Sequence, residues 1–247
     1  MTSPQSESQP APLYEGKAKI IYPTDDPQVL RAYYKDDATA FNAQKRGNIS
    51  GKGEINCTMS SALFQKLEAE DIPTHWQAQP SKREMLVRAV KIVPLEVVVR
   101  NIAAGSLCQQ TGVPFGTVLE QPLVDFYYKD DALGDPLLTP ARIALLQAAT
   151  PEQVEQLTQL SLQVNQFLIQ FFQSCGITLV DFKLEYGLDS EGNLLLADEI
   201  SPDTCRLWDT DESDPEQRVM DKDRFRKDLG QVEEAYQRVL ERVLAHC

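Results

Sequence analysis

The stretch from Leu179 to Tyr186 constrains the fold most, because apolar and charged residues alternate along it. Asp181, Lys183 and Glu185 occupy every second position, and successive side chains of a β-strand point to opposite faces. The pattern predicts a strand with one charged face and one apolar face, the latter made of Val180, Phe182, Leu184 and Tyr186. Residues 188–193 then predict a turn, and residues 194–200 a returning strand, so the segment is expected to form a hairpin.

The charged face of this hairpin indicates a site. An acid, a base and an acid in one row are costly to bury unless they are paired or solvated. Asp198 and Glu199 end the returning strand and are predicted to point to opposite faces, so that Asp198 can approach Glu185 or Asp181. Converging carboxylates favour a cation, and Mg²⁺ is held by one or two carboxylates plus phosphate oxygens. The alternative is an amphipathic edge strand with a solvated face. Arg206 suits an anion contact and an internal ion pair equally.

A second hairpin is predicted near the start of the chain. Residues 13–22 and 29–35 read as strands separated by a turn, and Gly16 precedes Lys17 and Lys19, which are expected on one strand face. A glycine lets the backbone approach a phosphate, and lysines neutralise its charge. The alternative is that these lysines only protect an edge strand from pairing.

A third candidate site follows an apolar run. Arg100 closes the strand formed by residues 95–100, which is predicted to break from the preceding run at Pro94. The arginine offers several donors for phosphate or carboxylate, while Gly105 and Ser106 offer backbone amides and a hydroxyl. The alternative is that Arg100 caps a helix or pairs with an acid.

The remaining segments are expected to be helices and loops. Apolar residues at helical spacing predict helices near 54–71, at 151–175 and from about 224 onward, the last docked on the core. Residues 36–56, 72–82 and 101–140 are expected to be loops, with Phe126, Tyr127 and Tyr128 exposed. The Pro- and Ser-containing residues 1–12 are expected to be a disordered tail.

The acidic composition narrows the classes of partner. The chain has 37 Asp and Glu against 24 Lys and Arg, a formal net charge of −13, which disfavours nucleic-acid binding. No apolar run reaches the ~18 residues of a membrane span, and the N-terminal segment lacks the features of a secretory signal. Five scattered cysteines favour a reducing cytoplasm. With only two histidines, Ser-His-Asp hydrolysis is disfavoured, and any chemistry is expected to use carboxylates, Lys, Arg, Ser and backbone amides.

Five ordered segments together resemble one protein family. IVPLEVVVRNIAAGS at 92–106 and LVDFKLEYG at 179–187 resemble the signature segments of the phosphoribosylaminoimidazole-succinocarboxamide synthase (SAICAR synthetase) family. Similar matches are LYEGKAK at 13–19, DEISPDTCRLWD at 198–209 and MDKDRFR at 220–226. The resemblance implies an ATP- and Mg²⁺-dependent ligase of purine biosynthesis. Such an enzyme joins the carboxylate of 5-amino-1-(5-phosphoribosyl)imidazole-4-carboxylate (CAIR) to L-aspartate through an acyl phosphate, giving SAICAR, ADP and phosphate.

The resemblance also implies a two-lobed α+β fold and roles for particular residues. A kinase-like β lobe at 13–92 would bind ATP, and an ATP-grasp-like lobe at 93–247 would carry substrate and metal. Nucleotide contacts would come from Lys17, Lys19, Arg88 and Glu185; metal contacts from Glu185 and Asp198; ribonucleotide contacts from Arg100, Ser106 and Arg206; and catalytic groups from Asp181, Lys183 and Asp203. Residues 50–53 would form a mobile substrate loop. Tyr186 stands where the signature usually has Phe or Ile, and Asn42 where some relatives have Asp, which leaves the metal role of its loop open.

Two other functions fit some of these features. A small-molecule kinase would use the same glycine-bearing hairpin, but the chain has neither an H-R-D-type loop nor a D-F-G triplet. A non-enzymatic acidic module could bind Mg²⁺ or a basic partner through residues 181–223, whose net charge is −10 (4 Lys and Arg minus 14 Asp and Glu). The sequence leaves open whether the chain forms a homo-oligomer.

Overall fold

A computed structural model describes residues 10–40 and 44–247. The predicted disordered tail therefore lies largely outside the described residues, and so does Asn42; residues 10–12 are exposed. Across the described ranges, none of the helices combines the length and apolar character needed to cross a membrane.

The N-terminal half builds an antiparallel sheet in the order β1-β2-β3-β7-β6. Its strands are β1 (Tyr14–Glu15), β2 (Lys19–Pro23), β3 (Val29–Tyr34), β6 (Trp76–Ser81) and β7 (Glu84–Arg88). The predicted strand 13–22 is interrupted after Glu15, because the chain turns at Gly16, whose N–H donates to the Lys19 carbonyl at 2.8 Å. Lys17 therefore lies in a turn. The expected loop 72–82 is wrong in part, since it contains β6.

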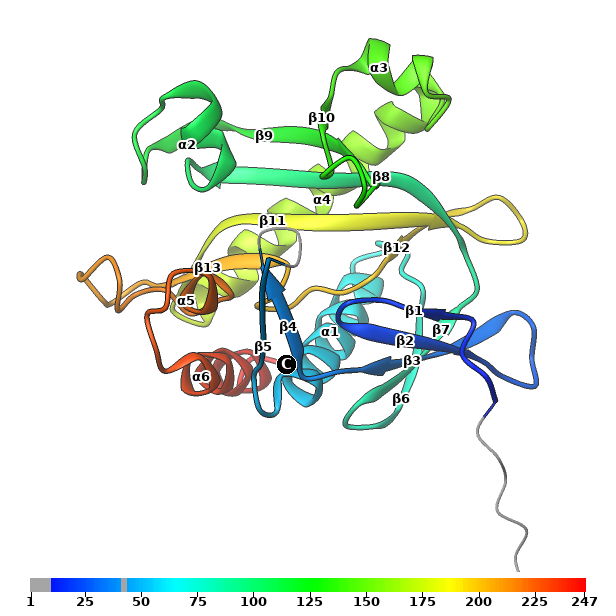
Figure 1. Cartoon of the computed structure of the whole chain (residues 1–247), viewed down its shortest axis with the longest axis horizontal. Helices are drawn as coiled ribbons and strands as arrows, with labels where there is room; N and C mark the ends of the chain where they lie inside the picture. Colours follow the sequence, from blue (N-terminus) through cyan, green and yellow to red (C-terminus); the bar gives the residue numbers. More distant parts are fainter. Residues whose placement is uncertain (1–9, 41–43) are drawn as a thin grey trace, which may run out of the picture.

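The larger sheet is also antiparallel, in the order β10-β9-β8-β11-β12, with β13 paired to β11. Its strands are β8 (Lys91–Ile102), β9 (Val118–Tyr128), β10 (Leu137–Leu138), β11 (Ile177–Leu188), β12 (Leu194–Ala197) and β13 (Cys205–Asp209). The long strands β8 and β11 lie side by side in Figure 1. The chain thus passes from the N-terminal sheet to the larger sheet between Arg88 and Lys91. The predicted hairpin around residues 188–193 is confirmed by the pairing of β11 with β12.

Three expectations for this sheet are wrong. The strand does not break at Pro94: β8 runs through it, because the β8–β11 register shifts between Glu185 and Gly187, and a proline is tolerated at such an irregularity. Phe126 is buried, since β9 pairs it with Val97 in the neighbouring strand; the 101–140 segment is therefore not all loop. Val180 does not share the core of Phe182 but packs in a separate cluster, next to a register shift between β11 and β13.

Helices cover these sheets. The predicted helices at 54–71 and 151–175 are confirmed as α1 (Lys52–Ala69) and α4 (Pro151–Ser174). Thr150 and Gln153 form a capping box that starts α4. The last predicted helix is divided into α5 (Asp223–Arg226) and α6 (Val232–Leu244); two shorter helices are α2 (Ser106–Thr111) and α3 (Pro140–Leu145). In Figure 1 α6 lies beside α1, against which it packs.

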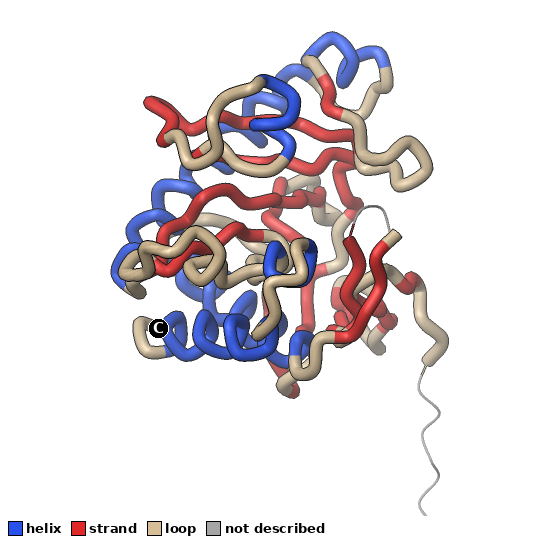
Figure 2. Tube along the Cα trace, turned by 60° about the vertical axis from the view of Figure 1, so that its left-hand side comes forward, coloured by secondary structure: helices blue, strands red, loops and turns tan. Residues whose placement is uncertain are grey.

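The expected loop at 36–56 contains a hairpin, β4 (Asp37–Ala40) with β5 (Lys45–Asn48). This hairpin stands against the segment around α5 (Figure 2): Lys45 donates to the Phe225 carbonyl at 2.6 Å, and Gly47 leaves room for the Phe225 ring. One apolar cluster joins both sheets, α1 and α4. The sheets are also linked by backbone hydrogen bonds from His75 to Leu196 at 2.8 Å and from Leu196 to Pro73 at 3.0 Å.

Candidate active site

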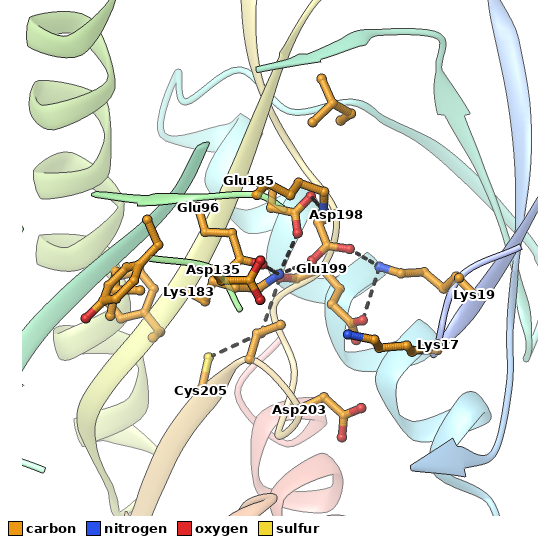
Figure 3. A pocket seen from close by; sticks show the side chains of 18 of the residues that line it. Lys17, Lys19, Glu96, Asp135, Lys183, Glu185, Asp198, Glu199, Asp203 and Cys205 are labelled. Carbon is orange, nitrogen blue, oxygen red and sulfur yellow. Dashed lines mark hydrogen bonds and ion pairs between the residues drawn. The ribbon is translucent and has the colours of Figure 1, made fainter. Parts of the chain in front are cut away.

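A cavity of about 940 Å³ opens between the two sheets. Its lining contains eleven of the residues that sequence analysis assigned to a site, from both halves of the chain: Lys17, Lys19, Arg88, Arg100, Ser106, Asp181, Lys183, Glu185, Asp198, Asp203 and Arg206. Gly105 and the expected substrate loop at 50–53 are not part of the described lining. Figure 3 shows Lys19 reaching across the cavity toward Asp198 and Glu199, with Lys183 and Glu185 beside them. The fold therefore brings residues more than 150 positions apart into one space, such as Lys19 and Asp198 (179 positions).

Lys19 makes the contact between the sheets. Its ammonium pairs with the Asp198 carboxylate and lies 3.1 Å from Glu199 Oε1. Both acids reach it, although alternation predicted them on opposite faces; that prediction is wrong because β12 ends at Ala197 and Asp198 has a φ of 61°. Burial lowers the pKa of Lys19, but the charges of Asp198 and Glu199 outweigh it and raise that pKa well above its ordinary value. Lys19 is therefore a firmly charged cation.

Lys183 forms ion pairs with both predicted metal ligands, Glu185 and Asp198. Its Nζ lies 2.5 Å from Glu185 Oε1 and 3.3 Å from Asp198 Oδ2. Lys129, at the end of β9, contacts Glu185 Oε2 at 2.5 Å. Burial opposes ionisation of Asp198, but Lys19 and Lys183 outweigh it and hold the pKa of this carboxyl well below its usual range. We call Lys19, Lys129, Lys183, Glu185 and Asp198 the lysine end of the cavity.

The donor set at the lysine end fits a hard divalent cation. In the described ranges no group of three or more His, Cys, Asp and Glu side chains is arranged to hold a metal ion. Glu185 and Asp198 supply two carboxylates on one cavity wall, and Mg²⁺ typically binds one or two carboxylates with phosphate oxygens and water. These residues therefore suit Mg²⁺ that arrives with a phosphate group.

Arg100 organises the opposite end of the cavity. Its side chain is 3% exposed and donates to Asp125 at 2.9 Å, Asp181 at 3.1 Å, Ser106 at 3.0 Å and Tyr127 at 2.9 Å. The predicted Arg100 and Ser106 are thus in contact. Of the alternatives for Arg100, pairing with an acid is observed.

Arg206 joins the same network from β13. It donates to Asp181 Oδ2 at 2.7 Å and to Asp223 Oδ2 at 3.1 Å, so it too forms internal ion pairs. Gly105 lies against this guanidinium: a Cβ there would fall 2.6 Å from Arg206 Nη2, and its φ is 54°, so only glycine fits. We call Arg100, Arg206, Asp125, Asp181 and Asp223 the arginine end.

Three predicted residues line the cavity but pair outside the lysine and arginine ends. Lys17 pairs with the exposed Asp131 at 2.6 Å rather than with Asp198. Arg88 lies 3.7 Å from Glu68 Oε1 and is partly exposed. Asp203 accepts hydrogen bonds from Lys52 and from Tyr236. The expected substrate loop at 50–53 includes the start of α1, and Lys52 is buried there.

Sequence reasoning missed several cavity residues. Lys129 and Tyr127 lie on or just after β9, which has no continuous buried face and hence no alternating pattern. Glu96 lines the cavity and lies 3.1 Å from Lys183. Its signal was available, since it is one acid within the apolar run Leu-Glu-Val-Val-Val.

A cavity between two sheets, lined by lysines, arginines and carboxylates, is typical of enzymes that bind anionic small molecules. The SAICAR synthetase family model matches residues 12–243. The chain is 71% identical over 232 residues to the phosphoribosylaminoimidazole-succinocarboxamide synthase of Nostoc punctiforme, covering 94% of this chain and 95% of that protein. The chain therefore belongs to the SAICAR synthetase family, and the predicted carbon–nitrogen ligase of purine biosynthesis is confirmed.

Solved structures agree with this assignment. The crystal structure of the Ehrlichia chaffeensis phosphoribosylaminoimidazole-succinocarboxamide synthase is 43% identical, with a TM-score of 0.91 over 95% of this chain and 99% of that chain. A SAICAR synthetase in complex with ADP is 42% identical, with a TM-score of 0.89 over 94% of this chain and 97% of that chain. The predicted two-lobed α+β fold of this family is thereby confirmed.

Proposed function

We propose that the chain joins the carboxylate of CAIR to the amine of L-aspartate, with ATP as the energy source. The observation that carries the proposal is the cavity in which Lys19 of the N-terminal sheet meets Asp198 of the larger sheet. Triphosphate binding needs cations and carboxylates that can share a metal, and this cavity supplies both. The ADP complex of a relative supports use of a nucleotide.

The reaction requires activation because a free carboxylate is a poor acyl donor. A carboxylate oxygen of CAIR attacks the γ-phosphorus of ATP, the bond to the β,γ-bridging oxygen breaks, and ADP leaves. The amine of aspartate then attacks the acyl carbon, phosphate departs, and the amine loses a proton. No side-chain nucleophile is needed, so the protein contributes positioning and charge stabilisation.

The lysine end is proposed as the nucleotide site. Lys19 and Lys17 would contact phosphates, and the segment after Arg88 would contact adenine. Lys17 is suited to this because its only described ion pair is with the exposed Asp131, which a ligand can displace at little cost. Glu185 and Asp198 would hold Mg²⁺, which neutralises phosphate charge when bound.

The arginine end is proposed as the ribonucleotide site. Arg100 and Arg206 present guanidinium groups beside the Ser106 hydroxyl, a donor set that suits phosphate. Asp181 of the arginine end, Lys183 of the lysine end and Asp203 all line the cavity and would orient the reacting carboxylate and amine. In this proposal residues 13–92 form the nucleotide lobe and residues 93–247 the substrate and metal lobe.

The five cysteines are all free, which supports a reducing cytoplasm as the compartment. A coupled assay tests the function: purified protein is supplied with CAIR, L-aspartate and MgATP, and each is omitted in turn. Release of ADP is expected only with all three present, together with a succinocarboxamide product. ADP release without aspartate would instead indicate a kinase, and no saturable binding of MgATP would overturn the proposal.

A further inference from the structure

The Asp203 carboxylate is held from behind by residues of two distant elements. Tyr236 of α6 donates its hydroxyl to Oδ1 at 2.7 Å, and Lys52 of α1 donates to Oδ2 at 2.9 Å. Lys222 approaches Oδ2 at 3.5 Å. Of these three donors, Lys222 is among the described residues that line the cavity, and Tyr236 and Lys52 are not. Asp203 therefore lies between two buried hydrogen-bond donors, Tyr236 and Lys52, and the Lys222 ammonium on the cavity wall.

The tyrosine hydroxyl has no packing role of its own. Tyr236 is fully buried and packs against Ala38, Ile49 and Ile55. A phenylalanine would fill almost the same space, and a buried hydroxyl without a partner is destabilising. The hydrogen bond to Asp203 therefore explains why this otherwise aliphatic face of α6 carries a tyrosine.

The charges around Asp203 fix the direction of this hydrogen bond. Burial opposes ionisation of Asp203, but the ammonium groups of Lys222 and Lys52 outweigh it and keep the pKa of the carboxyl well below its usual range. Burial and the Asp203 charge raise the pKa of Tyr236 well above its usual value. The tyrosine thus stays protonated and donates, and the carboxylate stays charged and accepts.

We propose that Tyr236 is a positioning residue: with Lys52 it fixes the Asp203 carboxylate, which in turn sets the place of the Lys222 ammonium on the cavity wall. The inference rests on the proposed function, because Asp203 and Lys222 face the space where CAIR and aspartate would react. Helix α6 then has two roles. Its apolar face packs in the core, and the Tyr236 hydroxyl oxygen supports activity through Asp203.

The test is Tyr236→Phe, which removes only that oxygen. A hydrogen bond to a charged group is worth roughly a 10- to 100-fold factor, so kcat is expected to fall about 10- to 100-fold. KM for MgATP is expected to change less than about twofold, because the lysine end is built from other residues. An unchanged kcat with a lowered thermal midpoint would show a purely structural role and overturn the inference.

Tyr186→Phe is the matched control. Tyr186 is also fully buried, and its hydroxyl bonds Ser161 at 2.8 Å; neither residue belongs to the described lining of the cavity. It is expected to lose stability while keeping kcat. Lys52→Met removes the other buried donor to Asp203 and is expected to give the same kinetic pattern as Tyr236→Phe, so this variant decides the matter should Tyr236→Phe not fold.

A double-mutant cycle tests whether Tyr236 affects kcat through the Asp203 carboxylate or by some other means. In the Asp203→Asn background, Tyr236→Phe is expected to change the residual kcat by less than about twofold, because its effect passes through that carboxylate. Multiplicative losses would overturn the inference. Wild-type protein that forms no SAICAR would reject the proposed function instead, so the two failures are distinguishable.

Discussion

The two ends of the cavity hold their charges in different ways. At the lysine end, Lys19 comes from β2 of the N-terminal sheet, and its acids Asp198 and Glu199 directly follow β12 of the larger sheet, so the contact joins the two sheets. At the arginine end, Arg100, Asp181 and Arg206 lie on the adjacent strands β8, β11 and β13, and Arg100 makes four side-chain hydrogen bonds.

The two arrangements suit one cavity to two kinds of ligand. A lysine ammonium is a point charge that changes partners readily, whereas an arginine fork is directional and loses little freedom when it binds. The lysine end is therefore suited to exchange ion pairs for phosphate and metal during turnover. The arginine end is prearranged and contributes to the fold itself. Four predictions test this contrast.

Arg100→Ala is expected to have the largest effect. The side chain is 3% exposed and that of its partner Asp181 5%, and removing one partner of a buried pair costs about 3–5 kcal/mol. Urea denaturation should show this loss in the free energy of unfolding. Lys17→Ala, which removes an exposed pair, is expected to change it by less than about 1 kcal/mol; equal losses in the two variants would contradict the contrast.

Asp198→Asn is expected to affect activity more than stability. The substitution removes a focused charge at the proposed metal site, where such groups contribute about a hundredfold or more to kcat. Glu199 still pairs with Lys19 at 3.1 Å, which limits the loss of stability. Steady-state kinetics at saturating MgATP measure the effect, and near-wild-type kcat would remove Asp198 from the metal site.

Lys19→Met and Lys17→Met compare a buried with an exposed lysine of the same hairpin. Lys19 has a side-chain exposure of 14%, and Lys17 one of 45%. Loss of a buried, paired charge costs about 2–5 kcal/mol and loss of a rim charge far less. The KM for MgATP is therefore expected to rise at least about 30-fold for Lys19→Met and less than about fivefold for Lys17→Met. The reverse order would place the nucleotide elsewhere in the cavity.

Much of the lysine end could be predicted because strand alternation is a strong local pattern. It placed Lys183 and Glu185 on one face, and the turn length brought Asp198 beside them. Alternation failed at Glu199, because the positive φ of Asp198 ends the strand geometry and no glycine marks that position.

Residues that depend on tertiary contacts could not be predicted. Lys129 directly follows β9, whose residues are mostly exposed and show no alternation of buried and exposed positions. Strand β13 has only five residues, which is too short for a clear alternating pattern. Tyr236 belongs to the apolar face of α6, and no pattern in the neighbouring sequence indicates that its hydroxyl bonds a cavity residue. By contrast α1 and α4 were predicted within about two residues, since long helices repeat their pattern over several turns.

Asp221 adjoins the arginine end, since it accepts a hydrogen bond from the Asp223 N–H, and its substitution tests whether a strained charge lies there. The carboxyl is fully buried and accepts hydrogen bonds from the N–H groups of Leu207 and Asp223, both at 2.8 Å. Burial, with the neighbouring Asp223 charge, raises the pKa of Asp221 to about 7, compared with about 3.9 in an unfolded chain.

A carboxyl whose folded-state pKa is raised contributes stability that is complete below its unfolded pKa and is lost as the pH rises through about 7. The depressed pKa of Asp223 acts the other way, but its contribution is lost only below about pH 4. Between pH 5 and pH 8 the wild type is therefore expected to lose about 2–3 kcal/mol more stability than Asp221→Asn, at 1.36 kcal/mol for each of the roughly two pH units between pH 5 and the folded-state pKa. Parallel urea denaturation at the two pH values measures this difference. Identical pH dependence of the two proteins would mean that Asp221 is already ionised at pH 5 and that the arginine end accommodates its charge without strain.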